Sequence, residues 1–319
     1  MRLENKKFWN NKKVLITGGT GYVGTNLTNR LRSYNADVLS FGSKTCNLEN
    51  QNEVDTYFKK LDKFDYIFHL AAWTAPGTFC LYHSAEQYHK NTLIHVYLLD
   101  AWHRYQPQAK LIGIGPSCAY PGHLNELKEE DYWKGEPHES LHAYAMTRRM
   151  LYAGQLAYKK QYGLNSIHVI FATLYGPGDY FDDVKSHVVS ALISRFCNAV
   201  CNNSDKVIVW GDGYQTRECI YIDDQIDSLL LSAEKYNGDL LNIGTGKSHT
   251  ICEIAEIIAD CCGYRGEIVY DTTKFVGVRH KVLNIDKAKR ELNWRPKVSL
   301  REGIQRTVDW YRKNILKKI

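Results

Sequence analysis

Short apolar runs alternate with longer mixed stretches along the first half of the chain. The runs read "KVLITGG", "ADVLSF", "FDYIFHLAA", "AKLIGIG" and "NSIHVIFATLYG", and the stretches between them are long enough for helices. Apolar runs that end at glycine or a polar residue are typical of strands buried on both faces. This βαβ repetition predicts an α/β fold, namely a Rossmann-type, doubly wound parallel sheet with crossover helices on both faces.

The pattern loosens after about residue 175, where "GPG" indicates a loop. Shorter strand candidates follow in "KVIVWGDG", "ECIYIDD" and "DLLNIGTG". Thr250 and Ser299 each precede a glutamate by three residues, which predicts capping boxes at the starts of two late helices.

No linker separates the two halves of the chain. We therefore expect a smaller α/β substrate domain that interleaves with the first domain. The dinucleotide-binding domain would take residues 1–175 plus roughly 207–235, and the substrate domain residues 176–206 and 236–319.

Composition narrows the class of protein. The 319 residues are 44% hydrophobic and 24% charged, and the net charge of +6 comes from interspersed signs, which argues against a nucleic-acid partner. The nine cysteines show no C-x-x-C and no zinc-ligand spacing with histidine, which predicts reduced thiols and no metal site. No window approaches the ~18 apolar residues of a membrane span, and the first residues lack a signal-peptide core. These features predict a cytoplasmic protein.

The stretch "TGGTGYVG" predicts a dinucleotide cofactor. It places Gly18, Gly21 and Gly24 between the first strand and the first helix. Glycines there allow a tight turn and let backbone amides approach a pyrophosphate at the positive end of the helix. The second strand ends in "LSFGSKT", which offers Ser43 and Lys44 where an acid would hold the ribose of NAD. This favours NADP, with NAD as the alternative.

The glycine pattern, "HLAA" at residues 69–72 and "YAMTR" from Tyr144 resemble an extended short-chain dehydrogenase/reductase. The blocks "GPSCAYP", "LYGPGDYF", "SHVVSALISRF", "VIVWGDGYQTRECIYIDD", "LNIGTG" and "LNWRPKVSL" resemble the GDP-fucose synthase family over nearly the whole chain. That family epimerises a GDP-4-keto-6-deoxy-mannose at two carbons and reduces its ketone with NADPH. The resemblance implies a GDP-sugar substrate and a homodimer.

The resemblance also implies a set of cofactor contacts. They are Gly18, Gly21, Tyr22, Val23, Gly24, Ser43, Lys44, Asn47, Leu48, Ala71, Tyr144 and Arg148.

Tyr144 and Arg148 lie four apart in a predicted helix, so their side chains share one face. By resemblance Tyr144 protonates the C4 oxygen, and a cation beside it stabilises the tyrosinate. The family has lysine where this chain has Arg148. Arginine keeps the charge but presents a broad planar fork, so the replacement is not conservative.

A second departure lies in "GPSCAYP". The family's catalytic hydroxyl falls on Pro116, which can donate no hydrogen bond. Ser117 is adjacent, but on an extended segment it would point to the opposite face, and it could substitute only if the proline changed the local register. Cys118 would return to the face of the missing hydroxyl. The resemblance makes Cys118 the base beside the ketone and His187 the acid that completes each inversion.

The remaining candidates concern the nucleotide. Arg217 resembles the residue that grips the diphosphate, and Arg279 with Lys281 would form a second phosphate contact. Trp210 either lies near the base or packs beneath its strand.

We therefore expect an NAD(P)-dependent epimerase/reductase that acts on a GDP-linked 4-keto deoxysugar or heptose. The alternatives are a relative that only epimerises, one that oxidises carbon 4 with retained NAD, and a catalytically impaired nucleotide-binding scaffold.

Overall fold

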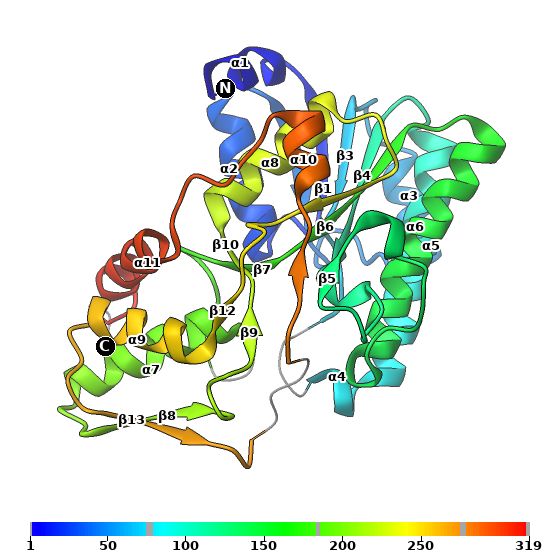
Figure 1. Cartoon of the computed structure of the whole chain (residues 1–319). Helices are drawn as coiled ribbons and strands as arrows, with labels where there is room; N and C mark the ends of the chain where they lie inside the picture. Colours follow the sequence, from blue (N-terminus) through cyan, green and yellow to red (C-terminus); the bar gives the residue numbers. More distant parts are fainter. Residues whose placement is uncertain (1, 75–78, 183–185, 275–278, 317–319) are drawn as a thin grey trace.

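The described part of the chain folds into a larger and a smaller lobe (Figure 1). In this computed structural model it comprises residues 2–74, 79–182, 186–274 and 279–316.

The larger lobe is built on a six-stranded sheet with the order β11-β6-β4-β3-β1-β2, in which every pairing is parallel. Its strands are β1 (Lys13–Thr17), β2 (Asp37–Phe41), β3 (Tyr66–His69), β4 (Lys110–Pro116), β6 (Ser166–Phe171) and β11 (Leu240–Ile243). The expected doubly wound α/β fold is confirmed.

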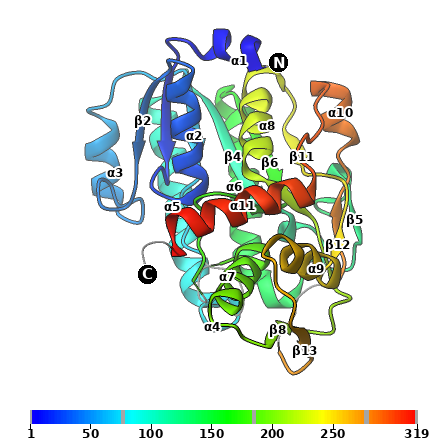
Figure 2. The same ribbon diagram turned by 90° about the vertical axis from the view of Figure 1, so that its left-hand side faces the viewer.

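Helices cover both faces of this sheet (Figures 1 and 2). One face carries α1 (Arg2–Trp9), α2 (Tyr22–Ser33), α8 (Ile222–Lys235) and α10 (Asp286–Leu292), and the other carries α3 (Gln51–Phe58), α5 (Ser84–Tyr105) and α6 (His142–Tyr162). Successive strand residues enter different cores: Val14 and Ile16 pack in one, and Leu15 packs in the other. Because both faces are covered, the strands read as unbroken apolar runs.

The smaller lobe has its own core, which lies between α7, α9 and α11 and the parallel pair of β8 and β13. The bounds are α7 (Val188–Cys201), α9 (Ile251–Cys261), α11 (Leu300–Asn314), β8 (Lys206–Trp210) and β13 (Glu267–Asp271). Short strand pairs complete the structure: β7 (Thr173–Tyr175) with β10 (Cys219–Tyr221), β9 (Thr216–Arg217) with β12 (His249–Thr250), and β5 (Glu126–Leu127) with β14 (Val282–Leu283). A short helix, α4 (Phe79–Tyr82), precedes α5.

The observed packing differs from the expected domain boundaries at two strands. Residues 207–235 were expected in the dinucleotide-binding domain, but β8 pairs with β13 in the smaller lobe. Residues 236–319 were expected in the substrate domain, but β11 joins β6 in the large sheet. Strand pairing over long sequence separations decides both cases, and apolar runs do not reveal their partners.

Two local predictions can be compared with the helix starts. Thr250 caps α9 with a complete capping box, in which its hydroxyl accepts from the Glu253 amide at 3.1 Å and its own amide donates to the Glu253 carboxylate at 2.9 Å. At α11 the Ser299 hydroxyl accepts from the Glu302 amide at 3.3 Å. No helix in the described ranges is long and apolar enough to cross a membrane.

Candidate active site

The glycine loop after β1 forms a cradle at the start of α2. Gly18 has a φ of +68°, and a Cβ there would lie 2.7 Å from the Ala71 amide nitrogen. A Cβ on Gly24 would lie 2.3 Å from the Gly18 carbonyl oxygen, so only glycine permits this packing. Gly21 is the N-cap of α2 and provides no side-chain hydrogen bond, and the first turn of the helix contains no acidic residue. The free amides of this first turn and the helix dipole suit a diphosphate, so these residues fit a dinucleotide.

The end of β2 adjoins this cradle, because the Gly19 amide donates to the Phe41 carbonyl at 2.8 Å. Ser43 and Lys44 are exposed in the turn that follows. Two other predicted cofactor residues are used locally: Leu48 is buried in the core, and the Asn47 side chain accepts from the Glu49 amide at 3.1 Å. A cofactor at this edge would therefore contact Ser43 and Lys44 rather than the side chains of Asn47 and Leu48.

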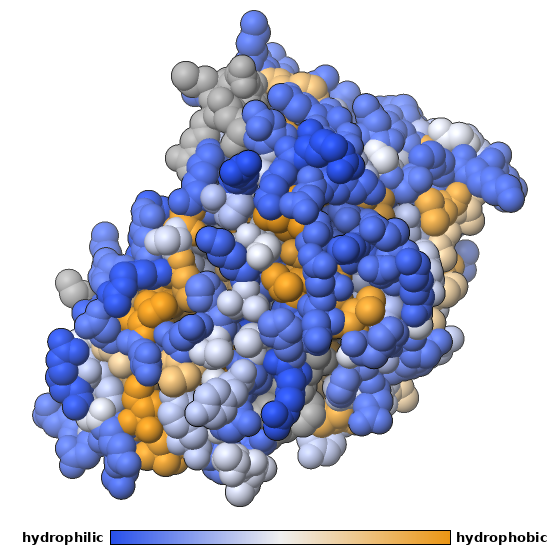
Figure 3. Space-filling view, viewed as in Figure 1, coloured by the Kyte–Doolittle hydropathy of each residue, from blue (hydrophilic) through white to orange (hydrophobic). Residues whose placement is uncertain are grey.

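One cleft of about 960 Å³ runs from the glycine loop to the smaller lobe. Such a volume lies at the upper end of ligand sites. Figure 3 shows that hydrophilic side chains cover most of one face, with apolar patches between the lobes and on the smaller lobe. Of the predicted site residues, the lining includes Gly18, Gly21, Tyr22, Val23, Gly24, Ser117, Cys118, Tyr144, Arg148, His187, Trp210, Arg217 and Lys281.

Tyr144 and Arg148 lie one turn apart on α6 and both line the cleft. The Arg148 guanidinium carbon lies 5.5 Å from the centre of the Tyr144 ring, within the range of a cation–π contact. Arg148 is only 5% exposed, and it donates one long hydrogen bond, of 3.4 Å, to the Ile114 carbonyl. The Arg148 Nε has no partner among the described residues. A buried cation with so few partners favours an anionic or strongly polar group beside it.

Histidines, rather than carboxylates, surround this cation. His69 contacts Thr17 through Nδ1 at 2.8 Å and His95 through Nε2 at 2.9 Å, which links the strand before the glycine loop to α5. Burial lowers the pKa of His69, His95 and His168, and the charge of Arg148 lowers each pKa further. The three rings are therefore neutral near pH 7 and leave the positive charge of Arg148 uncompensated.

The segment after β4 does not continue as an extended strand. β4 ends at Pro116, and Ser117–Ala119 form a 3-10 turn. The expectation that Ser117 points away from Cys118 is therefore wrong, because alternation of side chains holds only in extended chain. Both Ser117 and Cys118 line the cleft. The turn thus places the Ser117 side chain at the cleft directly after Pro116.

Three serines line the cleft, and their hydroxyls differ in what they bind. The Ser186 hydroxyl donates to the Asp182 carbonyl. The His138 Nδ1 accepts from the Ser140 amide at 3.3 Å, so the Ser140 hydroxyl, 2.8 Å away, must donate to the same nitrogen. The Ser117 hydroxyl makes no hydrogen bond within the described ranges. Of these three serines, Ser117 retains a proton to donate.

Cys118 and His187 line the cleft from different lobes. His187 is the N-cap of α7, and because its side chain makes no capping bond, the imidazole is available to the cleft. Desolvation lowers the pKa of His187 and raises the pKa of the Cys118 thiol, whereas Lys281 and Arg148 oppose the rise at Cys118. Desolvation by itself thus favours a protonated thiol at Cys118, and the two cations favour the thiolate.

The nucleotide candidates fall into two groups. Arg217, Trp210 and Lys281 line the cleft, and burial lowers the pKa of Arg217. Arg279 is absent from the lining: its side chain is 80% exposed and lies 3.6 Å from the Asp212 carboxylate. The sequence reasoning missed Arg195, which lines the cleft with its guanidinium 5.2 Å from the Trp210 ring. Its position one turn after Leu192 and two turns after Val188, which also line the cleft, was the available signal.

Comparisons with known proteins agree with this geometry. The family model described as "NAD dependent epimerase/dehydratase family" matches residues 14–244. A probable GDP-L-fucose synthase 1 of Oryza sativa subsp. japonica is 31% identical, over 95% of this chain and 93% of its own length. The GDP-L-colitose synthase of Yersinia pseudotuberculosis is 29% identical, over 94% and 97%.

Among solved structures, a GDP-mannoheptose C4 reductase from Campylobacter jejuni with NADP bound has a TM-score of 0.85 and 25% identity. The superposition covers 95% of this chain and 98% of the reductase chain. The likeness therefore extends over both lobes. By its motifs, its fold and its near-full-length relatives, the chain belongs to the NAD dependent epimerase/dehydratase family.

Proposed function

We propose that the protein is an NADP-linked epimerase-reductase for a GDP-linked 4-keto deoxysugar or heptose. One observation carries the proposal: a single cleft is lined by the glycine cradle, by Tyr144 with Arg148, by Cys118 and His187, and by the basic residues Arg217 and Lys281. The names of the relatives, which include a probable GDP-L-fucose synthase, a GDP-L-colitose synthase and a GDP-mannoheptose C4 reductase, support this substrate class.

On the oxygen side of the substrate, Tyr144 exchanges the proton of the C4 hydroxyl. Arg148 stabilises the tyrosinate by its charge. The Ser117 hydroxyl donates to the C4 oxygen and takes the role of the family's catalytic hydroxyl, whose position is Pro116 in this chain. NADP(H) bound at the α2 N-terminus supplies the hydride.

On the carbon side, the 4-keto group acidifies the hydrogens at carbons 3 and 5. Cys118 as thiolate accepts a proton from one of these carbons: the C–H bond breaks, an S–H bond forms, and the electron pair moves into an enolate on the C4 oxygen. His187 as imidazolium returns a proton from the other lobe, which inverts the carbon.

The preference for NADP over NAD rests on the end of β2. Ser43 and Lys44 are exposed beside the cradle, and "LSFGSKT" contains no carboxylate. A 2'-phosphate would meet a cation and a hydroxyl there.

Arg217, Trp210 and Lys281 would bind the GDP moiety, and Arg195 would join them. Arg217 and Arg195 offer planar forks that suit phosphate oxygens, and Trp210 offers an aromatic face at 40% exposure. Arg279 stays a prediction for this group, with its side chain held at Asp212.

We also propose a homodimer that forms through α5 and α6. Both helices lie in the outer layer, and they expose Tyr88, Val96, Met150 and Tyr162. Apolar side chains of this size favour contact with a second copy. Light scattering should give twice the monomer mass, and a monomer at all concentrations would exclude this contact.

A second function, epimerisation without net reduction, is favoured by a specific observation. Pro116 removes the usual donor, and Arg148 replaces the usual lysine, whereas Cys118 and His187 are both present in the cleft.

One experiment separates the two functions. The protein is incubated with GDP-4-keto-6-deoxy-mannose and NADPH, and the product is followed by nuclear magnetic resonance while the cofactor is followed by its absorbance. Stoichiometric cofactor oxidation with a new reduced, inverted sugar supports the epimerase-reductase. New epimers without cofactor oxidation support the second function, and an unchanged sugar with bound nucleotides supports a scaffold.

A further inference from the structure

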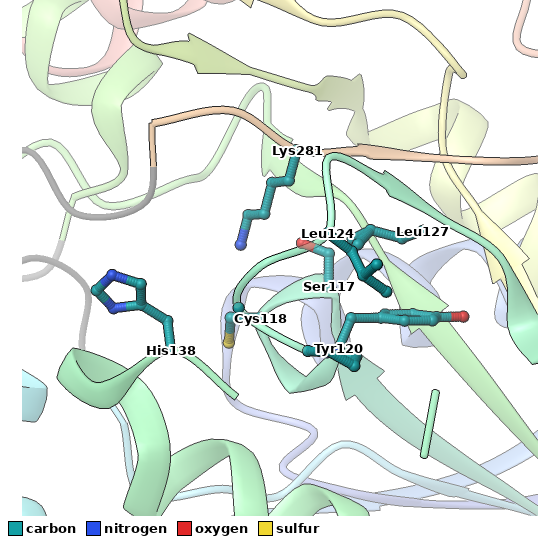
Figure 4. Close-up of a pocket in the computed structure, with 9 residues that line it drawn as sticks. Ser117, Cys118, Tyr120, Leu124, Leu127, His138 and Lys281 are labelled. Carbon is teal, nitrogen blue, oxygen red and sulfur yellow. The ribbon is translucent and has the colours of Figure 1, made fainter. Parts of the chain in front are cut away.

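A small side pocket opens beside Cys118, away from the glycine cradle. It measures about 10 Å³, roughly the space for one water, and it is lined by Ser117, Cys118, His138 and Lys281 together with apolar residues. In Figure 4 the Lys281 side chain extends from the segment before β14 toward the pocket, on the side where Cys118 and His138 lie. Cys118, His138 and Lys281 come from different parts of the sequence and line the same pocket.

Lys281 is held there by long-range contacts rather than by its neighbours in sequence. The following strand, β14, pairs with β5, and the Leu283 amide donates to the Glu218 carboxylate at 2.7 Å. The same carboxylate accepts from the amides of Thr245 and Gly246, at 2.6 and 2.9 Å. Glu218 is only 5% exposed, so it forms a rigid anchor for the chain that carries Lys281.

The charges around Cys118 have one sign. Lys281 faces it from the β14 segment and Arg148 from α6, and both favour the thiolate. Among the residues that the structure describes, the other titratable groups near Cys118 are Cys80 on α4, Tyr132 and His138, and none of these is a carboxylate. Burial also lowers the pKa of Lys281, and Cys118 opposes that change. Burial is the largest influence at both groups and raises the pKa of Cys118, and the attraction between the ammonium and the thiolate opposes burial at each of them.

We propose that Lys281 is the positive partner that favours the thiolate of Cys118 against the effect of its burial, so that Cys118 can accept a proton from the sugar. This role rests on the proposed function, in which Cys118 is the base. It differs from a phosphate contact, because it acts on the protein without any nucleotide. Lys281 is thus a positioning residue for the charge of Cys118, and Arg148 adds to the same field from α6.

The test measures the thiol directly. Alkylation of Cys118 by iodoacetamide is followed between about pH 6 and pH 10 in the absence of substrate, and the modified peptide is quantified by mass spectrometry. The midpoint of the pH profile reports the thiolate, whereas a rate at one pH also reflects nucleophilicity. The variants are Lys281→Met, Lys281→Arg and, as a matched loss of one charge on the exposed surface nearby, Lys128→Met.

We expect Lys281→Met to raise the midpoint by about one pH unit, which lowers the thiolate fraction near neutral pH about tenfold. Lys281→Arg should keep the parent midpoint, because it keeps the charge, and so should Lys128→Met. Circular dichroism spectra that match the parent show that the variants fold.

An unchanged midpoint in Lys281→Met overturns the proposal. If the same variant also binds GDP more weakly, Lys281 is a phosphate ligand only, and the proposed function stands. A parent Cys118 that stays unreactive up to about pH 10 contradicts the proposal as well, since Lys281 would then fail to offset the burial of the thiol. The proposed function is tested separately, by turnover of the parent with the keto sugar.

Discussion

The two sides of the proposed sugar site differ in how far they depart from the set of residues that the family resemblance implies. On the oxygen side, the resemblance implies a hydroxyl where this chain has Pro116 and a lysine where it has Arg148, while Tyr144 matches the implied set. On the carbon side, Cys118 and His187 line the cleft from opposite lobes, and Lys281 faces Cys118.

The difference shows that proton transfer at carbon and hydride chemistry at oxygen need different groups. Enolisation needs a base near the carbon, whereas reduction needs a donor on the oxygen and a cation beside the tyrosine. A change on one side can therefore weaken one reaction and leave the other. Substitutions on each side should separate the two rates.

The largest effect should come from Tyr144→Phe. Removal of the hydroxyl should lower the rate of ketone reduction by about 10²- to 10⁴-fold, because a general acid is lost. Deuterium uptake at carbons 3 and 5 should stay near the parent rate. Single-turnover oxidation of the cofactor measures the reduction rate, and proton magnetic resonance measures the deuterium uptake. Equal losses in both rates would show that the two sides do not act separately.

Ser117→Ala should follow, with a loss of reduction of about 100-fold from one missing oxyanion donor. Ser117→Thr keeps a hydroxyl and should retain most of the rate. Adding Pro116→Ser to Ser117→Ala should restore reduction, because it places a donor at the end of β4. If Ser117→Ala reduces the ketone as fast as the parent, another donor serves the oxygen.

Arg217→Ala should weaken GDP binding by about 1.5 to 3 kcal/mol, since a charge-assisted contact is lost. The affinity for the dinucleotide should not change, because Arg217 lies on β9, away from the glycine loop. Calorimetric titration with GDP and with NADP measures both. Parent-like affinity for GDP would remove Arg217 from the nucleotide site.

The smallest effect should come from Lys44→Asp, which should shift preference from NADP toward NAD by about tenfold. Lys44 is exposed, so water weakens its interaction with a 2'-phosphate to about 1 kcal/mol for each unit charge. The ratio of the two dissociation constants is the measurement. A parent protein that already prefers NAD would contradict this assignment.

The cofactor end could be predicted from sequence because its geometry is local. Gly18, Gly21 and Gly24 set the turn by their lack of a side chain, and strand and helix follow directly. The turn after Pro116 could not be predicted, because it depends on distant contacts: the next residues are buried, and the Tyr120 hydroxyl donates to the Asn242 side chain at 2.7 Å. The alternation of side chains along a strand does not indicate a hydrogen bond to a residue so far away in the sequence.

Lys281 shows the same limit on the substrate side. Its sequence context indicated only a loose phosphate contact, whereas its place beside Cys118 depends on β14 pairing with β5 and on the buried Glu218. Both contacts join segments far apart in the chain. The composition of the site was therefore predictable, but the partner of each side chain was not.

The most direct test compares the two reactions in one sample. In heavy water with GDP-4-keto-6-deoxy-mannose and NADPH, the parent should incorporate deuterium at carbon 3 or 5 faster than it oxidises the cofactor. Cys118→Ala should suppress that incorporation, because the base is removed. Pro116→Ser together with Arg148→Lys should raise the rate of reduction. Rapid reduction by the parent that is independent of Cys118, with no deuterium in the product, would contradict the separation of the two sides.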